Sequence, residues 1–489
     1  MNIKQAKIEI KNTVQAYLKK DAYGDYKIPS IHQRPLLMIG PPGIGKTQIM
    51  EQIAKECQIS LVAYTITHHT RQSAVGLPFI EKEEFDGKEY SITEYTMSEI
   101  IASIYKAQKE TGLKEGILFI DEINCVSETL APTMLQFLQC KTFGNQKIPE
   151  GWIIVAAGNP PEYNKSVREF DMVTLDRVRY LDVQANYYVW KEYALGRVHP
   201  MILSYLELKP NQFYKVENTI DGMQFVTARG WEDLGKLISL YEEMDIPVTQ
   251  ETMQQFLHHE EVSEDVAAYY QVYKKYEDDY GILDILDGKV STTLYQRVFD
   301  AAFDERVSLV NLLLDGLNKR MSDYTHQKKL VDTYYEFLKT YRAGIEEISY
   351  EELVVQQEEA FLLQKKSQLL TKEQIHFYQN FLSRLKKVSI SDSLSSKEAF
   401  YLVKEPFDAL VEQLQTMEAI CEKSLVHAFQ FMEDAFPKGQ EMVIFMTNLS
   451  MNAQSALFLS EHENEKYEEY KQTLLIGTRR AQLLDELNH

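Results

Sequence analysis

The sequence predicts an α/β fold in its first half, with a mostly parallel sheet flanked by helices, and an all-α second half. Glycine and proline are concentrated in the first part, because 15 of the 21 glycines precede residue 236 and 12 of the 14 prolines precede residue 248. Short apolar runs alternate there with glycine turns and helical periods, which is typical of strands joined by helical crossovers. No proline lies between Pro247 and Pro406, so long helices are expected in that interval.

One stripe in the second half has the spacing of a helix that packs along a single face. Its members are Ile375, Tyr378, Leu382 and Leu385. Intervals of three and four residues fit either a short coiled coil or the core face of a helical bundle.

The bulk composition limits the classes of function. A formal charge of −21 and a pI near 5.1 argue against a dedicated nucleic-acid binder, whose affinity comes largely from lysine and arginine on phosphates. The four cysteines are scattered without a CxxC pair, which favours a reducing compartment over a disulfide framework or a zinc site. The N-terminal sequence MNIKQAKIEIKN has no apolar core and does not resemble a signal peptide. We therefore expect a cytoplasmic protein.

The longest uncharged run extends from residue 442 to residue 460. It contains polar residues such as Asn448 and Asn452, and is therefore too polar for a membrane span. We expect this run to form a core helix, and we expect no membrane span in the chain.

A phosphate-binding loop follows the first apolar run, Leu36-Leu37-Met38-Ile39. The loop GPPGIGKT satisfies the pattern G-x-x-x-x-G-K-[ST] and precedes a helical stretch. Its residues are Gly40, Pro41, Pro42, Gly43, Ile44, Gly45, Lys46 and Thr47. Backbone N–H groups and the helix N-terminus suit phosphates, Lys46 suits the β- and γ-phosphates, and the Thr47 hydroxyl suits Mg²⁺.

An adjacent acidic pair ends another apolar run, Gly116 to Ile120. Asp121 at the end of this strand is expected to hold the magnesium shell, and Glu122 is expected to accept a proton from an attacking water. A carboxylate pair in this position suits hydrolysis better than transfer to a bound acceptor.

A third apolar run, Trp152 to Ala157, is followed by Gly158 and Asn159. An amide at the end of a neighbouring strand can donate to the γ-phosphate and orient the lytic water without adding charge. The alternative is a turn asparagine before Pro160 and Pro161, which local sequence alone favours.

The order of these features resembles that of the AAA+ ATPases. The series comprises the phosphate loop, Asp121-Glu122, Asn159, Asp176-Arg177 and the segment Thr227 to Trp231. In that family they correspond to Walker A, Walker B, sensor 1, the arginine finger and sensor 2. Two details resemble the MoxR branch, namely a Gly-Asn hairpin in FGNQKIPEGW (143–152) and an insertion over 67–93.

The resemblance covers about residues 30 to 280 and implies roles for two arginines. Arg177 is implied to act in trans as the finger that meets the γ-phosphate bound by a neighbouring subunit. Arg168 and Arg179 remain alternatives for that role. Arg229, at the start of a lid helix capped by Thr227, is implied to approach the γ-phosphate of its own subunit.

With this resemblance the chain divides into four expected parts. These are an N-terminal helix (1–29), an AAA+ α/β core (30–185), a helical lid with sensor 2 (186–280), and an all-α extension (281–489). We recognise no named domain in the extension.

The resemblance also implies an activity. A MoxR-type ATPase uses ATP and Mg²⁺, forms an oligomeric ring that is usually hexameric, and remodels or activates a client protein. Relatives often work with a von Willebrand factor A domain protein. Two alternatives remain: a nucleic-acid-dependent motor or restriction-type NTPase, and a nucleotide-gated interaction scaffold.

Overall fold

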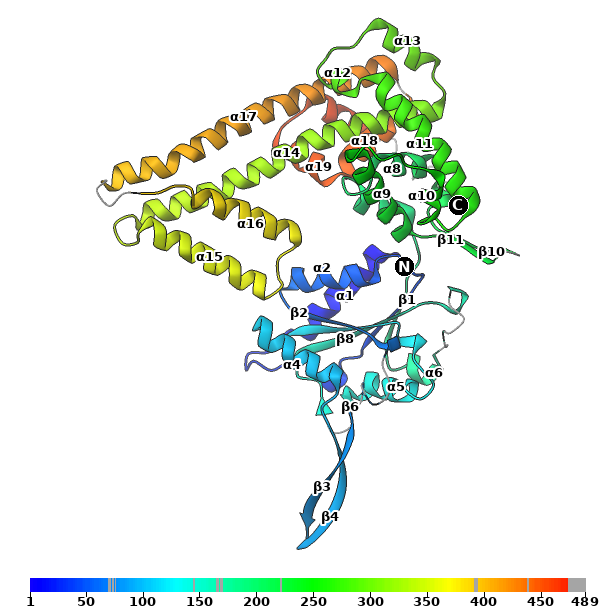
Figure 1. Cartoon of the computed structure of the whole chain (residues 1–489), viewed down its shortest axis with the longest axis vertical. Coiled ribbons are helices and arrows are strands. Elements are labelled where there is room, and N and C mark those ends of the chain that lie inside the picture. The colour runs from blue at the N-terminus through cyan, green and yellow to red at the C-terminus, as the bar shows by residue number, and fades with distance from the viewer. Residues whose placement is uncertain are drawn as a thin grey trace. The chain divides into compact units, whose positions relative to one another are not determined.

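The computed structural model describes residues 1–68, 72, 74, 76–143, 146–163, 167, 170–219, 222–390, 395–437 and 439–473 (Figure 1). Contacts divide the chain into two compact units. The first contains Met1–Val189 and Val355–Leu382, and the second contains Trp190–Val354 and Ser383–His489. After residue 350 the chain passes from the second unit to the first and back again. The first of these boundaries falls inside α15 (Tyr350–Lys366), and the second falls inside α16 (Lys372–Leu385). The predicted domain limits at residues 29, 185 and 280 stay predictions.

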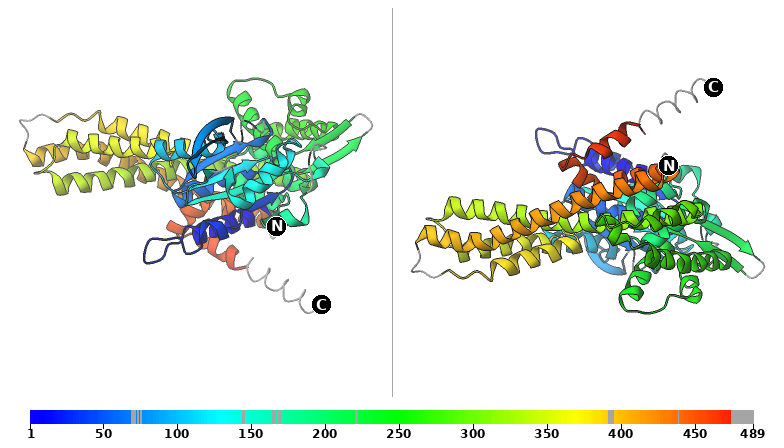
Figure 2. Two further views of the ribbon diagram at one scale, coloured as in Figure 1. Left: turned by 90° about the horizontal axis from the view of Figure 1, so that it is seen from below. Right: turned by 90° about the horizontal axis from the view of Figure 1, so that it is seen from above.

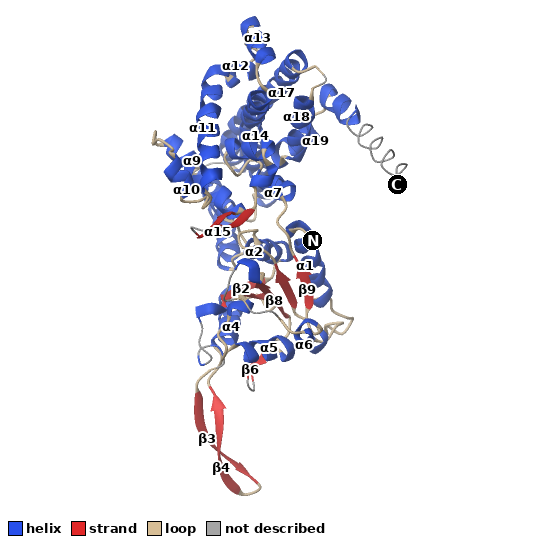
Figure 3. Ribbon diagram, turned by 90° about the vertical axis from the view of Figure 1, so that its right-hand side faces the viewer, coloured by secondary structure: helices blue, strands red, loops and turns tan. Residues whose placement is uncertain are grey.

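A five-stranded parallel sheet forms the centre of the first unit (Figure 3). Its strands are β1 (Leu36–Ile39), β2 (Ser60–Thr65), β5 (Gly116–Asp121), β8 (Trp152–Gly158) and β9 (Arg179–Asp182). The order is β2-β5-β8-β1-β9, and each neighbouring pair is parallel. The predicted fold class is confirmed. In this order the carboxyl ends of β1, β8 and β5 lie next to one another.

Helices cover both faces of this sheet. On one face, α1 (Ile3–Tyr17) and α2 (Lys46–Cys57) pack against alternate strand residues such as Met38 and Phe119. On the other face, α4 (Glu99–Thr111) and α5 (Ala131–Cys140) pack against Leu37 and Leu118. Successive side chains of a strand point to opposite faces, so an entirely apolar strand supplies both cores at once.

Two hairpins extend the first unit. One, labelled in Figure 1, joins β3 (Pro78–Phe85) to β4 (Lys88–Tyr95) within the region where an insertion was expected. Most of its residues are exposed. The other joins β6 (Thr142–Phe143) to β7 (Gln146–Lys147), which confirms the hairpin predicted in FGNQKIPEGW. The Gly-Asn turn itself lies outside the described residues. Short helical elements connect the strands, namely η1 (Ser30–His32), η2 (Ile66–His68), η3 (Ile123–Cys125), η4 (Pro161–Tyr163) and α6 (Met172–Leu175).

The second unit is largely helical, as the sequence predicts. Its elements before the long helices are α7 (Tyr187–Ala194, which begins in the first unit), α8 (Pro200–Leu208), η5 (Pro210–Gln212), β10 (Lys215–Thr219), β11 (Gly222–Val226), α9 (Ala228–Glu243), α10 (Gln250–Gln254), α11 (Glu260–Tyr280), α12 (Ile282–Leu286) and α13 (Thr292–Asp300). The antiparallel hairpin β10–β11 interrupts the region expected to be wholly helical. Gly222 starts β11 with φ of 130°, a backbone conformation that residues with a side chain rarely adopt.

Two long helices follow, α14 (Phe303–Gly344) and α17 (Ser396–Ala435). They run antiparallel and side by side in the second unit (Figure 2). The Gln327 amide donates to the Leu410 carbonyl, and the Tyr334 hydroxyl donates to the Val403 carbonyl further along the pair. In the first unit, Tyr378 of the predicted α16 stripe contacts Phe361 of α15 with ring centroids 5.9 Å apart. This part of the stripe therefore packs against a neighbouring helix.

The uncharged run forms two helices, and the expectation of one core helix was wrong. α18 (Gln440–Met451) and α19 (Ala453–Glu461) meet at an angle of 84°. The Asn452 side chain accepts hydrogen bonds from the backbone N–H groups of Gln454 and Ser455, so it ends one helix and caps the next. Among the described helices none is long and apolar enough by itself to cross a membrane, and only this bent pair passes that test when taken together.

A buried polar network joins the elements of the second unit. The Lys191 ammonium, 4% exposed, donates to both carboxylate oxygens of Glu207 at 2.8 Å. The Asn448 amide of α18 donates to Glu207 at 3.3 Å and to Asn311 of α14 at 3.2 Å. Asn311 donates in turn to Ser204 of α8 at 3.3 Å. The network therefore connects the helices predicted as a lid to the C-terminal extension.

Glu242 of α9 gives a pH-dependent test of this packing. Burial raises its pKa, but bonds and charges from His199, Lys274 and Tyr270 outweigh burial and lower the pKa to about 2. A carboxylate with a lowered pKa stabilises the fold above its ordinary pKa of 4.5, and the stabilisation disappears as the pH falls toward 2.

We predict that Glu242→Gln lowers the stability of the second unit by about 1–2 kcal/mol at pH 7. Thermal unfolding of the full chain between pH 7 and pH 3 should show this difference narrowing on acidification. Glu243→Gln, at an exposed position of the same helix, is the matched control and should change little. A difference for Glu242→Gln that does not vary with pH would contradict the assignment.

Candidate active site

The phosphate loop joins the end of β1 to the start of α2. Gly43 and Gly45 have φ of 77° and 94°, and Gly45 directly precedes the helix. Only glycine adopts this left-handed conformation without strain. The path of the loop backbone therefore explains why glycine occupies these two positions of the sequence pattern. The loop leads into the N-terminus of α2, where backbone N–H groups and the positive end of the helix dipole favour an anion.

Lys46 is buried at the first position of α2, with 8% of its surface exposed. Its ammonium donates to the carbonyls of Gly40 and Pro41 at 2.6 and 2.9 Å, and to the Asn159 side-chain oxygen at 2.8 Å. Since the oxygen of the Asn159 amide faces Lys46, its NH₂ group remains the donor end. The structure thus brings together two residues that are 113 positions apart.

Thr47 and Asp121 form the second contact across the sheet. The Thr47 hydroxyl donates to Asp121 Oδ2 at 3.1 Å, while Asp121 Oδ1 accepts from the Glu122 backbone N–H at 2.9 Å. A hydroxyl and a carboxylate are oxygen ligands of the kind that Mg²⁺ prefers, and it usually binds through one or two of them together with phosphates. The two residues predicted to hold Mg²⁺ therefore fit that ion.

Glu122 has a left-handed backbone, with φ of 57° and ψ of 34°. A residue other than glycine in this region typically costs on the order of 1–3 kcal/mol, and such residues concentrate at functional sites. Burial raises the pKa of the neighbouring Cys125 thiol, and the Glu122 and Asp121 carboxylates raise it further. Cys125 therefore stays a thiol at neutral pH.

Asn124 is a residue of this site that the sequence prediction missed. It is 4% exposed, and its amide NH₂ donates to the Asn159 carbonyl at 2.7 Å. Its amide oxygen accepts from the Asn159 backbone N–H at 3.3 Å. One side chain therefore holds both backbone groups of Asn159, and it comes from the segment that follows Glu122. The one signal in the sequence was a polar residue two positions after the acidic pair at the strand end.

Gly158 leaves room for this contact. A Cβ atom at Gly158 would lie 2.4 Å from the Asn124 amide oxygen, too close for any side chain. The φ of Gly158 is not in the left-handed range, so the backbone conformation does not require a glycine here. The close approach of Asn124 does.

The three candidate finger arginines differ in their surroundings. Arg179 lies on β9, and its guanidinium bonds the Thr13 hydroxyl at 2.6 Å and pairs with Glu9, so it holds α1 against the sheet. Arg177 follows α6, is exposed, and donates to the Gln139 side chain. Arg168 lies outside the described residues.

Arg229 belongs to the second unit. It is exposed in the first turn of α9, whose N-cap Thr227 accepts from the Gly230 backbone N–H at 3.3 Å. The predicted helix start is therefore confirmed, while the contribution of Arg229 to a nucleotide site stays a prediction.

Comparison with known proteins identifies a domain within the first unit. Residues 36–174 match the ATPase family associated with various cellular activities (AAA), and they form an AAA ATPase domain. No curated protein matches the chain. Similar solved structures include a RuvB mutant from Thermotoga maritima, which is 13% identical, with an alignment that covers 53% of this chain and 69% of that chain at a TM-score of 0.29.

We predict that Asn124→Ala lowers the turnover of ATP by about 10- to 100-fold, because Asn159 loses the side chain that fixes its backbone. Nucleotide binding should change much less, since the phosphate loop is untouched. Steady-state kcat and the affinity for a fluorescent ATP analogue measure the two effects separately.

A double-variant cycle identifies the cause. Gly158→Ala should reduce turnover because its methyl group displaces the Asn124 amide, and adding it to Asn124→Ala should have a smaller effect than it has alone. Independent, multiplicative losses would show that Asn124 does not act through this contact.

Proposed function

We propose that this chain, which carries an AAA ATPase domain, hydrolyses ATP at the edge of its sheet where β1, β8 and β5 end. One observation carries the proposal. The Lys46 ammonium meets the Asn159 amide at 2.8 Å, while the Thr47 hydroxyl meets Asp121 at 3.1 Å, so binding and acid–base groups share one edge.

The chemistry follows from these groups. The loop backbone and Lys46 bind the β- and γ-phosphates, while Thr47 and Asp121 would hold Mg²⁺, which neutralises phosphate charge when bound. Glu122 accepts a proton from the attacking water while the oxygen of that water forms a bond to the γ-phosphorus. The bond from that phosphorus to the β,γ-bridging oxygen breaks, so that ADP leaves. The Asn159 amide, held by Asn124 and Lys46, orients the water and the γ-phosphate.

The proposal extends to a ring in which Arg177 completes the site of a neighbouring subunit. Its exposure at the end of α6 supports this role, because a finger must leave its own subunit. Arg179 is a poorer candidate, since its guanidinium is bonded to Thr13 and Glu9 of its own chain. In the same proposal Arg229 senses the γ-phosphate of its own subunit, and the ring is hexameric.

We further propose, from the resemblance to the MoxR branch, that this cytoplasmic ring remodels or activates a client protein, with a von Willebrand factor A domain protein as partner. The hairpin β6–β7 just before β8, and the hairpin β3–β4 between β2 and α4, support that branch because both lie where the resemblance expects them. A nucleic-acid motor is the weaker candidate, because the chain carries a formal charge of −21.

We predict that Arg177→Ala and Glu122→Gln each lower ATP turnover by about 10³-fold or more when assembled alone. Mixed at equal amounts, they should recover up to about a quarter of the wild-type rate. In a ring with one interface per site, half of the pockets keep Glu122 and half of those face an intact Arg177.

The matched control is a mixture of Lys46→Ala with Glu122→Gln. Both changes damage the pocket itself, so every site in that mixture is defective and no recovery is expected. If the first mixture recovers nothing while light scattering shows that both variants still oligomerise, the shared site is refuted.

The remaining alternatives are separated by two measurements. Stimulation of turnover by DNA or RNA that falls steeply with salt would favour the nucleic-acid motor. A Glu122→Gln protein that hydrolyses nothing but keeps its cellular role would favour the nucleotide-gated scaffold.

A further inference from the structure

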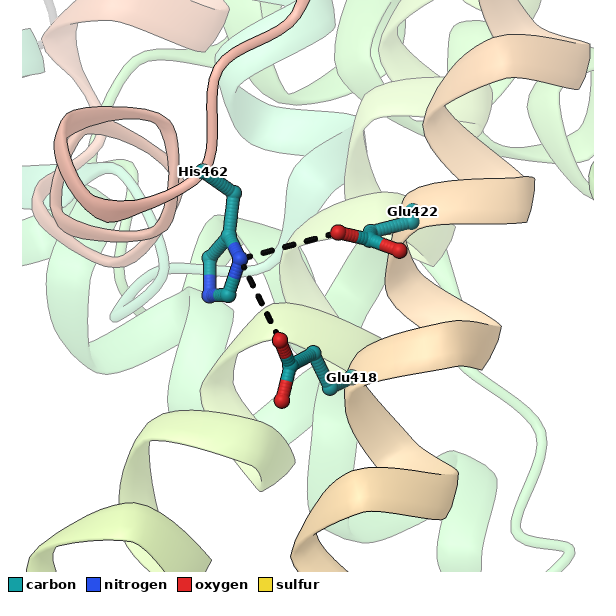
Figure 4. Close-up of side chains that lie close together, drawn as sticks. All are labelled: Glu418, Glu422 and His462. Carbon is teal, nitrogen blue, oxygen red and sulfur yellow. Dashed lines mark ion pairs between the residues drawn. The ribbon is translucent and has the colours of Figure 1, made fainter.

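Three side chains with metal-ligating atoms meet in the second unit, away from the phosphate loop in the sequence. Glu418 and Glu422 are one helical turn apart on α17, and His462 directly follows α19 (Figure 4). One ligand atom of each residue lies within 4.8 Å of the others. The i, i+4 spacing places both carboxylates on the same face of α17, where they point toward the imidazole.

The imidazole of His462 is held in one orientation. Its ring stacks on Phe458 with centroids 4.4 Å apart and meets Tyr324 of α14 edge-on at 5.6 Å. Its Nε2 atom is 3.0 Å from the Tyr324 hydroxyl, and its backbone N–H donates to the Phe458 carbonyl at 3.0 Å. These contacts leave Nδ1 as the atom that faces the carboxylates (Figure 4).

The distances at Nδ1 fit a shared ligand better than direct bonds. Nδ1 lies 3.5 Å from the nearest oxygen of Glu418 and 3.6 Å from that of Glu422. A charge-assisted hydrogen bond would be about 2.7–2.9 Å long. Two ligands on a tetrahedral zinc ion, each about 2.0–2.1 Å from it, are separated by about 3.3–3.4 Å.

We propose that Glu418, Glu422 and His462 bind a divalent transition-metal ion, with Zn²⁺ as the ion that fits best. Zinc accepts one imidazole nitrogen and two carboxylates as ligands, whereas Mg²⁺ and Ca²⁺ favour sites made of oxygen ligands only. The Glu422 side chain is 55% exposed, so water can occupy the fourth position from that side.

The Tyr324 hydroxyl acts as a positioning group. When Nδ1 binds the metal, the proton resides on Nε2 and is donated to the Tyr324 oxygen, which is the outer-shell arrangement common for metal-bound histidine. The bound ion would tie α17 to the end of α19, with α14 supporting both.

The test uses the full chain in the Asp121→Asn background, which removes a ligand of the nucleotide site. Chelator-treated protein is dialysed against Zn²⁺ in excess Mg²⁺, and bound zinc is counted by elemental analysis. We expect the Asp121→Asn parent to bind one more equivalent of zinc than the same protein carrying His462→Gln or the pair Glu418→Gln/Glu422→Gln. The affinity of those variants for zinc should fall at least about tenfold. Tyr324→Phe keeps the ring packing and should weaken binding about tenfold.

His326→Gln is the matched control, because this exposed histidine of α14 bonds the Ser322 carbonyl of its own helix and should leave zinc binding unchanged. Circular dichroism checks that each variant is folded. Replacing Zn²⁺ with Co²⁺ gives a second readout, the visible absorption of a four-coordinate ion, which should vanish in His462→Gln. Equal zinc content in the parent and in a folded His462→Gln protein would overturn the proposal and leave an ordinary histidine–glutamate ion pair.

Discussion

The candidate active site depends on the register between three parallel strands. β8 pairs with β1 so that Gly158 lies beside Ile39, and with β5 so that Ala156 lies beside Ile120. These pairings put Asn159 next to the phosphate loop on one side and the acidic pair on the other. A shift of one residue in β8 would turn its side chains to the opposite faces and break both contacts of Asn159. Since β8 is apolar and buried on both faces, the close packing of differently shaped side chains against the two helix layers opposes such a shift, rather than hydrophobicity alone.

The second unit depends on a different constraint, a buried charge. Lys191 and Glu207 are paired within the helices predicted as a lid, and the Asn448 amide of the extension donates to Glu207 and to Asn311. A buried ion pair loses several kcal/mol if one partner is left uncompensated, so the amides matter for stability as well as for orientation. These contacts join α14 and α18 of the extension to the lid-type helices α7 and α8 within the second unit.

The sequence predicted features whose cause is local. The strand–loop–helix of the phosphate site, the acidic strand end and the cap at Thr227 each follow from a few adjacent residues, and each element forms where it was expected. The break at Asn452 was missed, because an uncharged apolar run favours one helix as readily as two. The hairpin β10–β11 was also missed, since the helical pattern around it dominated the expectation for the region.

By itself, the sequence determined the residue types of the site and their order along the chain, because phosphate binding and proton transfer require particular groups next to strand ends. Only the tertiary structure decided which of them meet. Lys46 and Asn159, Asn124 and Asn159, or His462 and Glu418 are brought together by strand register and helix packing over long separations. Those contacts depend on the total burial of many side chains, and no short stretch of sequence contains that information.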